Sequence, residues 1–450
     1  MSELRLFNTL RKEKQAFTPI TPNHVGIYAC GPTVYDRIHV GNARPLVLFD
    51  ILVRLLRKQY KQVTYVRNIT DVDDKINQRS LDLKISIDQL CKQTISDFHD
   101  DCIALNVATP DVEPRATEHI KEMLQMIATL IQTGHAYEAA GHVLFSVETM
   151  AEYGKLSGRS MDEMIAGARV EVASYKKAPA DFVLWKPSDA DQPGWDSPYG
   201  RGRPGWHIEC SAMSAKYLGA EFDIHAGGLD LIFPHHHENE IAQSCCAHET
   251  QKMAQYWVHN GYVTVNGEKM SKSTGNFVTV KEALSKHRGE SIRYALMAAH
   301  YRAPLDYSDA QVLESKQALD RLYRVAGEAI ATTPSAEFID ILNDDLNTPQ
   351  ALAFLHQKTK SVNKGTHDAA GEIKACAQLL GLLSYSSQEW FQFDDNMQDL
   401  TIEQIENQIE ERRIARLNKD FSKADNIRQL LVQQGIELLD SADGTSWQRK

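Results

Sequence analysis

The chain has 450 residues, of which 42% are hydrophobic and 24% are charged, and its formal net charge at pH 7 is −11. A chain of this length is too long for one compact core, so two to four domains are expected. The negative balance excludes a general electrostatic attraction to nucleic acid. Any nucleic-acid partner would have to be held by local basic faces.

The apolar runs and the cysteines narrow the class of protein further. The apolar run over residues 46–56 is interrupted by Asp50 and Arg54, and residues 1–11 contain no hydrophobic region of the signal-peptide kind. The seven cysteines are odd in number and scattered along the chain, which argues against a disulfide framework and favours a reducing compartment. We therefore expect a cytoplasmic protein without membrane contact, whose cysteines serve metal or thiol chemistry.

The first elements of the chain predict a β-α-β unit. Alternation over residues 25–29 ends at Cys30 and is followed by a Gly-Pro pair, which indicates a buried strand and then a loop. Apolar residues recur at helical spacing over residues 43–56, and residues 63–66 predict the next strand. In open parallel sheets the ligand crevice lies outside the carboxyl ends of the strands, and helix N-termini offer free amides to phosphate. Both features meet between Cys30 and Gly41.

Two short motifs suit phosphate chemistry. HVGN, at residues 39–42, falls at the start of the first predicted helix, where a side-chain donor and free amides face phosphate and Gly41 lets a flat base pack on the backbone. KMSKS, at residues 269–273, places Lys269 and Lys272 on a loop after an Asn-Gly hairpin turn, and such a loop can close over a triphosphate. Each motif also has an ordinary explanation, as a helix cap and as a solvated loop.

A metal site is predicted independently of these motifs. Two cysteines far apart in the sequence, Cys30 and Cys210, each lie at the end of a predicted element, and a His and a Glu four residues apart share one helix face. That set can supply four ligands to zinc. Counting back from Glu240, His236 lies four residues away and His237 three, and both offsets reach the same face.

In this order, HVGN and KMSKS resemble the two signature motifs of class I aminoacyl-tRNA synthetases. Four further segments are similar to the cysteinyl-tRNA synthetase family, and the resemblance runs nearly end to end. These segments are CGPTVYD at 30–36, NITDVDDK at 68–75, GWHIECS at 205–211 and PHHHENE at 234–240. The resemblance implies a ligase that activates L-cysteine with ATP to cysteinyl-adenylate, releases pyrophosphate, and transfers cysteine to the 3′-terminal ribose of tRNA(Cys).

The element pattern and the resemblance together predict an α/β fold. A Rossmann-like parallel-sheet catalytic domain is split by an insertion and followed by a helical bundle and a small C-terminal anticodon-binding module. The boundaries we expect are residues 1–110 for the first half of the catalytic domain, 111–200 for a connective insertion, 201–262 for the second half, 263–307 for the KMSKS-containing stem-contact region, 308–395 for the bundle and 396–450 for the C-terminal module.

The resemblance implies roles for individual residues. His39 and Asn42 would stabilise charge on the phosphates, with Gly41 beside them in the ATP site. Lys269 and Lys272 would close on the pyrophosphate portion, with Mg²⁺ accompanying ATP. Asn42 departs from the commonest form of this motif, but an amide can still donate a hydrogen bond to phosphate. The implied ligands of one zinc ion per chain are Cys30, Cys210, His236 and Glu240.

One zinc ligand stays open because of an extra histidine. The family usually has two histidines between the proline and the Glu-Asn-Glu, whereas this chain has His235, His236 and His237. We choose His236 as the ligand and hold His237 in reserve.

Five residues in matched segments are assigned to holding cysteine or the nucleotide: Gly31, Thr70, Trp206, His225 and Asp230. Trp206 has an alternative as a core residue, and His225 as part of a tight turn.

The C-terminal module carries basic side chains between Arg412 and Arg428 that alternate with acidic ones, which is typical of a solvated helix pair. By resemblance this end recognises the anticodon, with Trp447 as a base-stacking platform. The partners implied are ATP, L-cysteine and tRNA(Cys), and we expect a monomer.

Two other functions stay open. A ligase that joins cysteine to a small amino-sugar would resemble the catalytic half but lack a C-terminal tRNA module. A non-catalytic relative would use the fold as a zinc- or RNA-binding module. The bundle and basic tail favour tRNA over the first alternative, and the intact motif residues argue against the second.

Overall fold

The computed structural model describes residues 2–159, 163, 173–232, 235–270, 276–362, 369–393, 400–441 and 444–449. The chain forms two compact units. The sheet unit comprises Met1–Val280, Leu296–Ser308 and Ala336–Leu352, and the helical unit comprises Lys281–Ala295, Asp309–Ser335 and Ala353–Lys450. None of the helices in the described ranges is long and apolar enough to cross a membrane.

A four-stranded parallel sheet forms the middle of the sheet unit. Its strands run in the order β10 (Ala254–Asn260), β9 (Phe222–Gly228), β3 (His24–Ala29) and β4 (Gln62–Arg67). Ile27 of β3 lies opposite both Tyr65 and Ile224. Residues 25–29 are all buried, as expected for a strand covered on both faces.

The predicted β-α-β unit is confirmed by α1 (Val40–Gln59), which joins β3 to the parallel strand β4. The helix begins with a capping box, in which the His39 side chain accepts from the Asn42 amide and the Asn42 side chain accepts from the His39 amide. The fully buried guanidinium of Arg44 ties the first turns of α1 to the chain beyond β10. It donates to the carbonyl oxygens of Gly261, Tyr262, His300 and Ala303.

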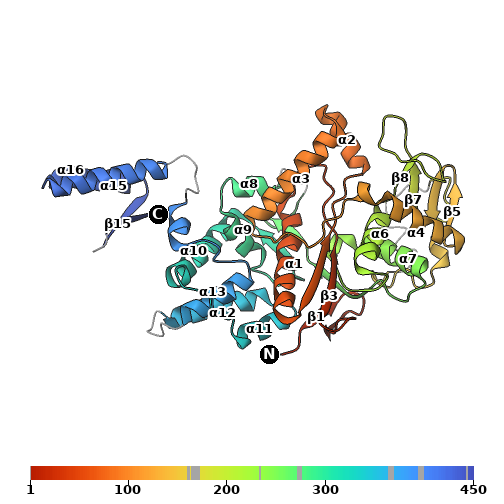
Figure 1. The fold of residues 1–450 in the computed structure, drawn as a ribbon, viewed down its shortest axis with the longest axis horizontal. Coiled ribbons are helices and arrows are strands. Elements are labelled where there is room, and N and C mark those ends of the chain that lie inside the picture. The colour runs from red at the N-terminus through yellow and green to blue at the C-terminus, as the bar shows by residue number, and fades with distance from the viewer. Residues whose placement is uncertain are drawn as a thin grey trace. The chain divides into compact units, whose positions relative to one another are not determined.

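The chain between β4 and β9 adds helices and a second sheet. α2 (Asp74–Leu83) and α3 (Ile87–Ala104) lie side by side (Figure 1), and η1 (Ala116–His119) leads into α4 (Ile120–Gln132). The second sheet is antiparallel and has the order β5 (Ala136–Ala139), β6 (His142–Phe145), β7 (Phe182–Pro187) and β8 (Gly202–Pro204), with η2 (Val147–Thr149) after β6. α6 (Trp206–Leu218) precedes β9, and α7 (His236–His248) joins β9 to β10. α4, α6 and α7 pack on one another.

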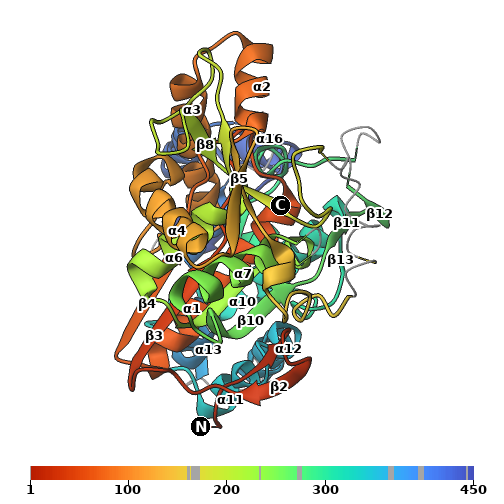
Figure 2. The ribbon, with the colours of Figure 1, turned by 90° about the vertical axis from the view of Figure 1, so that its right-hand side faces the viewer.

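A three-stranded sheet follows β10 (Figure 2). β11 (Val263–Val265) pairs with β12 (Glu268–Lys269) antiparallel and with β13 (Leu305–Tyr307) in parallel. Asn266 and Gly267 join β11 to β12 with φ values of 53° and 79°, so the predicted Asn-Gly hairpin is confirmed. The remaining elements of the sheet unit are β1 (Arg5–Asn8), β2 (Glu13–Ala16), η3 (Leu229–Leu231) and α11 (Ala336–Asn343).

The helical unit consists of a bundle and a C-terminal module. The bundle contains α10 (Asp309–Ala326), α13 (Ala370–Leu379) and α14 (Ser387–Gln392), together with most of α8 (Val280–Leu284), α9 (Gly289–Leu296) and α12 (Thr348–Val362). Val280, Leu296 and residues 348–352 of the last three helices belong to the sheet unit. Buried Glu290 on α9 connects α10 to the chain after α13. Its carboxylate accepts from the Tyr323 hydroxyl at 3.0 Å and from the amides of Leu383 and Ser384 at 2.8 and 3.2 Å.

The C-terminal module has a core of its own. α15 (Ile402–Leu417) and α16 (Phe421–Gln433) pack on the hairpin of β14 (Ile436–Ser441) and β15 (Gly444–Arg449). Trp447 is 3% exposed, and its indole N–H donates to Glu406 at 2.7 Å. The prediction that Trp447 stacks on a base is therefore wrong, because its ring fills the core of the module.

An ion pair between Arg412 and Asp440 joins α15 to β14. Two Nη–Oδ distances are 2.8 Å each, and the hydrogen bonds from Arg412 and then Thr445 lower the pKa of Asp440 below its ordinary value. A carboxyl group with a lowered folded-state pKa contributes stability above its unfolded-state pKa of about 3.9 and loses that contribution as the pH falls.

We expect Asp440→Asn to lower the free energy of unfolding of the module at pH 7 by at most about 1 kcal/mol, because the pair is partly exposed. At about pH 2 the difference from the wild type should be clearly smaller than at pH 7, because the contribution declines as the pH falls from the unfolded-state pKa towards the lowered folded-state pKa. Amide hydrogen exchange of α15 and β14, corrected for intrinsic rates at each pH, measures the change in unfolding free energy at both pH values. Glu410→Gln, which removes the exposed partner of Arg413, is the control. An effect of equal size at both pH values would contradict the assignment.

Candidate metal and nucleotide site

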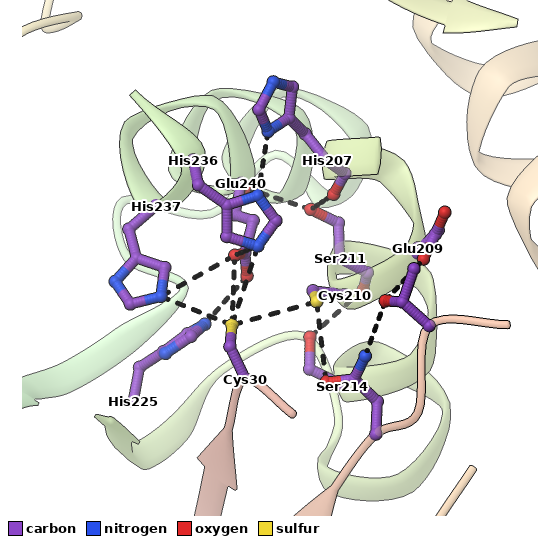
Figure 3. A network of polar contacts seen from close by, with 12 residues as sticks. Cys30, His207, Glu209, Cys210, Ser211, Ser214, His225, His236, His237 and Glu240 are labelled. Carbon is purple, nitrogen blue, oxygen red and sulfur yellow. Dashed lines mark hydrogen bonds and ion pairs between the residues drawn. The ribbon is translucent and has the colours of Figure 1, made fainter. Parts of the chain in front are cut away.

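The carboxyl end of β3 meets the first turns of α6 and α7 in a buried cluster of metal-ligating side chains (Figure 3). Cys30 follows β3 directly and lies at the centre of the cluster. Its Sγ is 3.8 Å from Cys210 Sγ, 3.6 Å from His236 Nε2 and 3.5 Å from Glu240 Oε1. His236 and Glu240 are one helical turn apart on α7, and their Nε2 and Oε1 atoms are 2.9 Å apart. Three of these four residues are at most 1% exposed.

These distances match a tetrahedral zinc site. Zinc bonds of about 2.3 Å to sulfur and about 2.0–2.2 Å to nitrogen or oxygen require sulfurs about 3.8 Å apart and sulfur-to-nitrogen or sulfur-to-oxygen edges of about 3.6 Å. The three edges from Cys30 have these lengths within 0.1 Å. The His236–Glu240 edge of 2.9 Å is shorter than the roughly 3.4 Å expected, because the two side chains bond to each other. The donor set of two thiols, one imidazole and one carboxylate is therefore suited to zinc.

A second set of donors shares two of these residues. Cys30, His225, His237 and Glu240 also bring their ligand atoms within 4.8 Å of one another. His237 Nε2 is 3.3 Å from Cys30 Sγ but 3.9 Å from Glu240 Oε1, and its Nδ1 contacts His259 at 2.8 Å. This set contains one sulfur instead of two, so it offers zinc a poorer match in ligand type. His235 belongs to neither set among the described residues.

The titration behaviour of the cluster reflects burial and close pairing. Burial raises the pKa of Cys30, whereas the hydrogen bond from Cys30 lowers the pKa of Cys210 to about 6. Burial alone would lower the pKa of His236, but Glu240 and Cys210 raise it to about 10. Burial also opposes ionisation of Glu240, yet His225 and His236 bring its pKa well below the ordinary value. The cluster thus concentrates negative charge that only a proton or a metal cation can balance.

A cavity of about 730 Å³ opens beside the cluster and reaches the start of α1. This volume lies within the range of small-molecule sites. Lining residues that the sequence analysis assigned to ligands are Cys30, Gly31, His39, Gly41, Asn42 and Asp230. The backbone of Lys269 ends β12, but its side chain and all of Lys272 lie outside the described residues, so their predicted roles stay predictions.

Two family models match most of the chain. Residues 16–317 match the class I (C) tRNA synthetase catalytic domain, and residues 337–387 match the DALR domain. The cysteine–tRNA ligase of Rhodospirillum rubrum is 54% identical over 457 residues, which cover 99% of each chain. That of Acidiphilium cryptum is 53% identical over 453 residues, which cover 100% of each. The chain belongs to the cysteine–tRNA ligase family.

Solved structures place this cysteine–tRNA ligase family member in the class I synthetase fold. Mycobacterium tuberculosis methionyl-tRNA synthetase in complex with methionyl-adenylate has a TM-score of 0.54 at 13% identity, over 80% of this chain and 90% of that one. LeuRS of Agrobacterium radiobacter K84, in a ternary complex, has a TM-score of 0.58 at 11% identity, over 83% and 85%. Identities this low concern the fold alone, and the predicted fold class is confirmed.

The sequence analysis missed a polar network behind the two sulfurs of this family member. Asn68 Oδ1 accepts from the Gly31 amide at 2.9 Å and lies 3.7 Å from Cys210 Sγ. Asn68 Nδ2 donates to the Thr70 hydroxyl at 3.3 Å, and that hydroxyl donates to Glu209 at 3.0 Å. All but Gly31 are at most 1% exposed. Asn68 lies in a segment quoted for its resemblance, but neither periodicity nor spacing distinguishes it from its neighbours.

The five predicted substrate-binding residues lie in three places. Gly31 and Asp230 line the cavity. Trp206 is 38% exposed and stacks on the His236 ring at 3.9 Å between centroids, so it is not a core residue. Thr70 and His225 are buried behind the cluster, where Thr70 contacts Glu209 and His225 lies 2.7 Å from Glu240.

We expect Gly31→Ala to displace the loop that carries Cys30. A Cβ at Gly31 would lie 1.6 Å from the Asn68 carbonyl oxygen, whereas a Cβ at Gly26, on the preceding strand β3, would meet its nearest neighbour at 3.4 Å. Gly31→Ala should therefore cost roughly 2 kcal/mol or more in unfolding free energy, and Gly26→Ala less than about 1 kcal/mol. Urea unfolding of both variants measures the difference. Similar losses would show that the contact between Gly31 and Asn68 does not constrain the loop.

Proposed function

We propose that the chain activates L-cysteine with ATP, forming cysteinyl-adenylate and pyrophosphate, and then transfers cysteine to the 3′-terminal ribose of tRNA(Cys). One observation carries this proposal: Cys30, the central residue of the cluster, and the N-terminus of α1 line the same cavity. A thiol held at the cluster and a triphosphate held at α1 would thus lie within one site. The named relatives, which match over at least 99% of the chain, support the same reaction.

We propose zinc as the resident metal, with Cys30, Cys210, His236 and Glu240 as ligands and His237 in reserve. When bound, zinc would supply a soft Lewis-acidic site that binds the cysteine thiol in preference to the serine hydroxyl. A pocket selective by shape alone separates near-isosteres by only about 10–200-fold, so a discriminating ligand site is needed. His225, bonded to Glu240, and His207, 2.9 Å from His236 Nδ1, orient two of the proposed ligands.

The residues at the start of α1 suit the phosphates of ATP. The side chains of His39 and Asn42 can donate to phosphate oxygens through Nε2 and Nδ2, and Gly41 allows close approach. Lys269 and Lys272 would stabilise charge on the departing pyrophosphate, with Mg²⁺ bound to ATP. The attacking group in this first step is the carboxylate of cysteine, and the attacked atom is the α-phosphorus.

The second step joins cysteine to RNA. The terminal ribose hydroxyl of tRNA attacks the adenylate carbonyl and releases AMP. Gly31, Trp206 and Asp230 would position cysteine or the nucleotide, while Thr70 and His225 would act through the buried contacts that they make. We place the reaction in the cytoplasm, where tRNA is consumed in translation, and expect the chain to act as a monomer.

Single substitutions separate the two possible ligand sets. Cys210→Ser and His236→Ala should each weaken zinc binding by more than about 100-fold, whereas His237→Ala should weaken it by about tenfold or less. Cys246→Ser, at a partly buried cysteine outside both sets, should leave zinc content unchanged. Zinc affinity measured with a competing chelator, beside circular dichroism as a test of folding, decides the matter. A large loss in His237→Ala with none in His236→Ala would support the second set.

Charging of bulk tRNA by the purified protein tests substrate, metal and partner together. Cysteine should be joined to tRNA in an ATP-dependent manner, serine should not, and zinc chelation should remove the activity. Cysteine-dependent ATP–pyrophosphate exchange without tRNA charging would favour a ligase for a small amine acceptor. Absence of both reactions in the zinc-loaded protein would contradict an enzymatic role.

A further inference from the structure

The bundle of the helical unit contains a basic hollow that the proposed reaction does not use. It has a volume of about 590 Å³ and lies between α10 and α12. Its lining residues are Arg321, Arg324, Val325, His356, Thr359 and Lys360. Three of these six side chains are cationic at neutral pH, and none is acidic. We call this feature the α10–α12 hollow.

The cations of the hollow differ from their neighbours on the same two helices. Among the described residues, no carboxylate forms an ion pair with Arg321, Arg324 or Lys360, and all three are exposed. Lys316, also on α10, is paired with Asp320 at 3.5 Å, and Lys358, also on α12, with Glu372 at 3.4 Å. Among the described residues, carboxylates therefore pair with Lys316 and Lys358 on these helices but with none of the three cations that line the hollow. Arg324 instead lies over the Phe391 ring, 5.1 Å from its centroid, and this contact leaves its charge without a counter-ion.

His356 adds a neutral donor to the wall of the hollow. Its Nε2 lies 2.7 Å from the Tyr294 hydroxyl, and burial raises the pKa of Tyr294 to about 12, so this hydroxyl keeps its proton. Burial, and then Arg321 and Lys360, lower the pKa of His356. When Tyr294 donates to Nε2, the proton of the neutral ring resides on Nδ1. The Thr359 hydroxyl is engaged with the Leu355 carbonyl at 2.8 Å, so the hollow offers donors and positive charge but few acceptors.

We propose that the α10–α12 hollow binds phosphate groups of the tRNA backbone. This inference rests on the proposed function, because it assigns a second contact to the same tRNA. Arginine presents a planar fork that matches phosphate oxygens, and lysine adds a point charge. In a chain with a net charge of −11, RNA has to be held by local groups of unpaired cations. Such contacts position the RNA without reading its sequence.

The test compares two double variants with the same change in net charge. Arg321→Ala/Lys360→Ala removes two cations of the hollow, and Lys316→Ala/Lys358→Ala removes the two paired lysines on the same helices. Binding of labelled tRNA is measured between about 50 and about 200 mM salt. Cysteine-dependent ATP–pyrophosphate exchange is measured on the same samples. A third variant, Arg321→Lys/Lys360→Arg, keeps the charge.

The hollow variant should bind tRNA roughly tenfold more weakly, and the slope of log affinity against log salt should fall by about 1 to 2. Its pyrophosphate exchange should stay unchanged, since this step needs no tRNA. The paired-lysine variant and the charge-keeping variant should each stay within about twofold of the wild type. Equal weakening in both alanine variants, or none in the hollow variant, would overturn the proposal.

The same data separate this inference from the proposed reaction. If only the hollow variant loses tRNA affinity, and the wild-type protein shows no cysteine-dependent pyrophosphate exchange, the data would support the phosphate site and contradict the proposed activity. Normal pyrophosphate exchange and tRNA charging, together with unchanged tRNA binding in the hollow variant, would support the proposed activity and contradict the phosphate site. A wild-type protein that binds no tRNA at all would contradict both.

Discussion

The close approach of Gly31 to the Asn68 carbonyl, where β3 and β4 end side by side, is the constraint on which the site depends. Only a residue without Cβ fits there, and the Gly31 amide is held by the Asn68 side chain. Because Cys30 immediately precedes this contact, its sulfur is aimed at the first turns of α6 and α7. Asn68 also touches Cys210, so one buried amide determines how the two sulfurs lie. Networks of this kind, when fully bonded, rigidify a site.

The cluster is also an electrostatic arrangement. Burying a carboxylate and a thiolate is costly unless a positive partner lies close by. His225 and His236 contact opposite oxygens of the Glu240 carboxylate, and the protonated ring of His236, whose pKa Glu240 and Cys210 raise to about 10 against the effect of burial, supplies that partner. A divalent cation among the same atoms would compensate the sulfurs and the carboxylate together, which is why the proposed metal and the perturbed pKa values have the same physical origin. Trp206, stacked on His236, limits the access of water to this edge of the cluster.

The distribution of charge in the helical unit shows why net charge is a poor guide to RNA binding. The C-terminal module, which the sequence made the leading candidate for RNA contact, engages several of its basic side chains internally. Arg412 is committed to Asp440 and Arg413 to Glu410. In the bundle, cations that have no carboxylate partner among the described residues are gathered on adjoining turns of α10 and α12. Whether a basic side chain is available to a phosphate depends on its packed neighbours, which composition does not report.

The sequence by itself determined the features that depend on local geometry. These include the β-α-β unit around α1, the Asn-Gly hairpin, and the spacing that places His236 and Glu240 on one turn of a helix. The tertiary structure decided which distant groups meet. It brought Cys30 within 3.8 Å of Cys210, 180 residues away, added His225 as a further donor beside His237, and buried Trp447. Periodicity reports how a residue lies on its own helix or strand. The distance between two side chains on different elements depends on how those elements pack, and no local pattern encodes that packing.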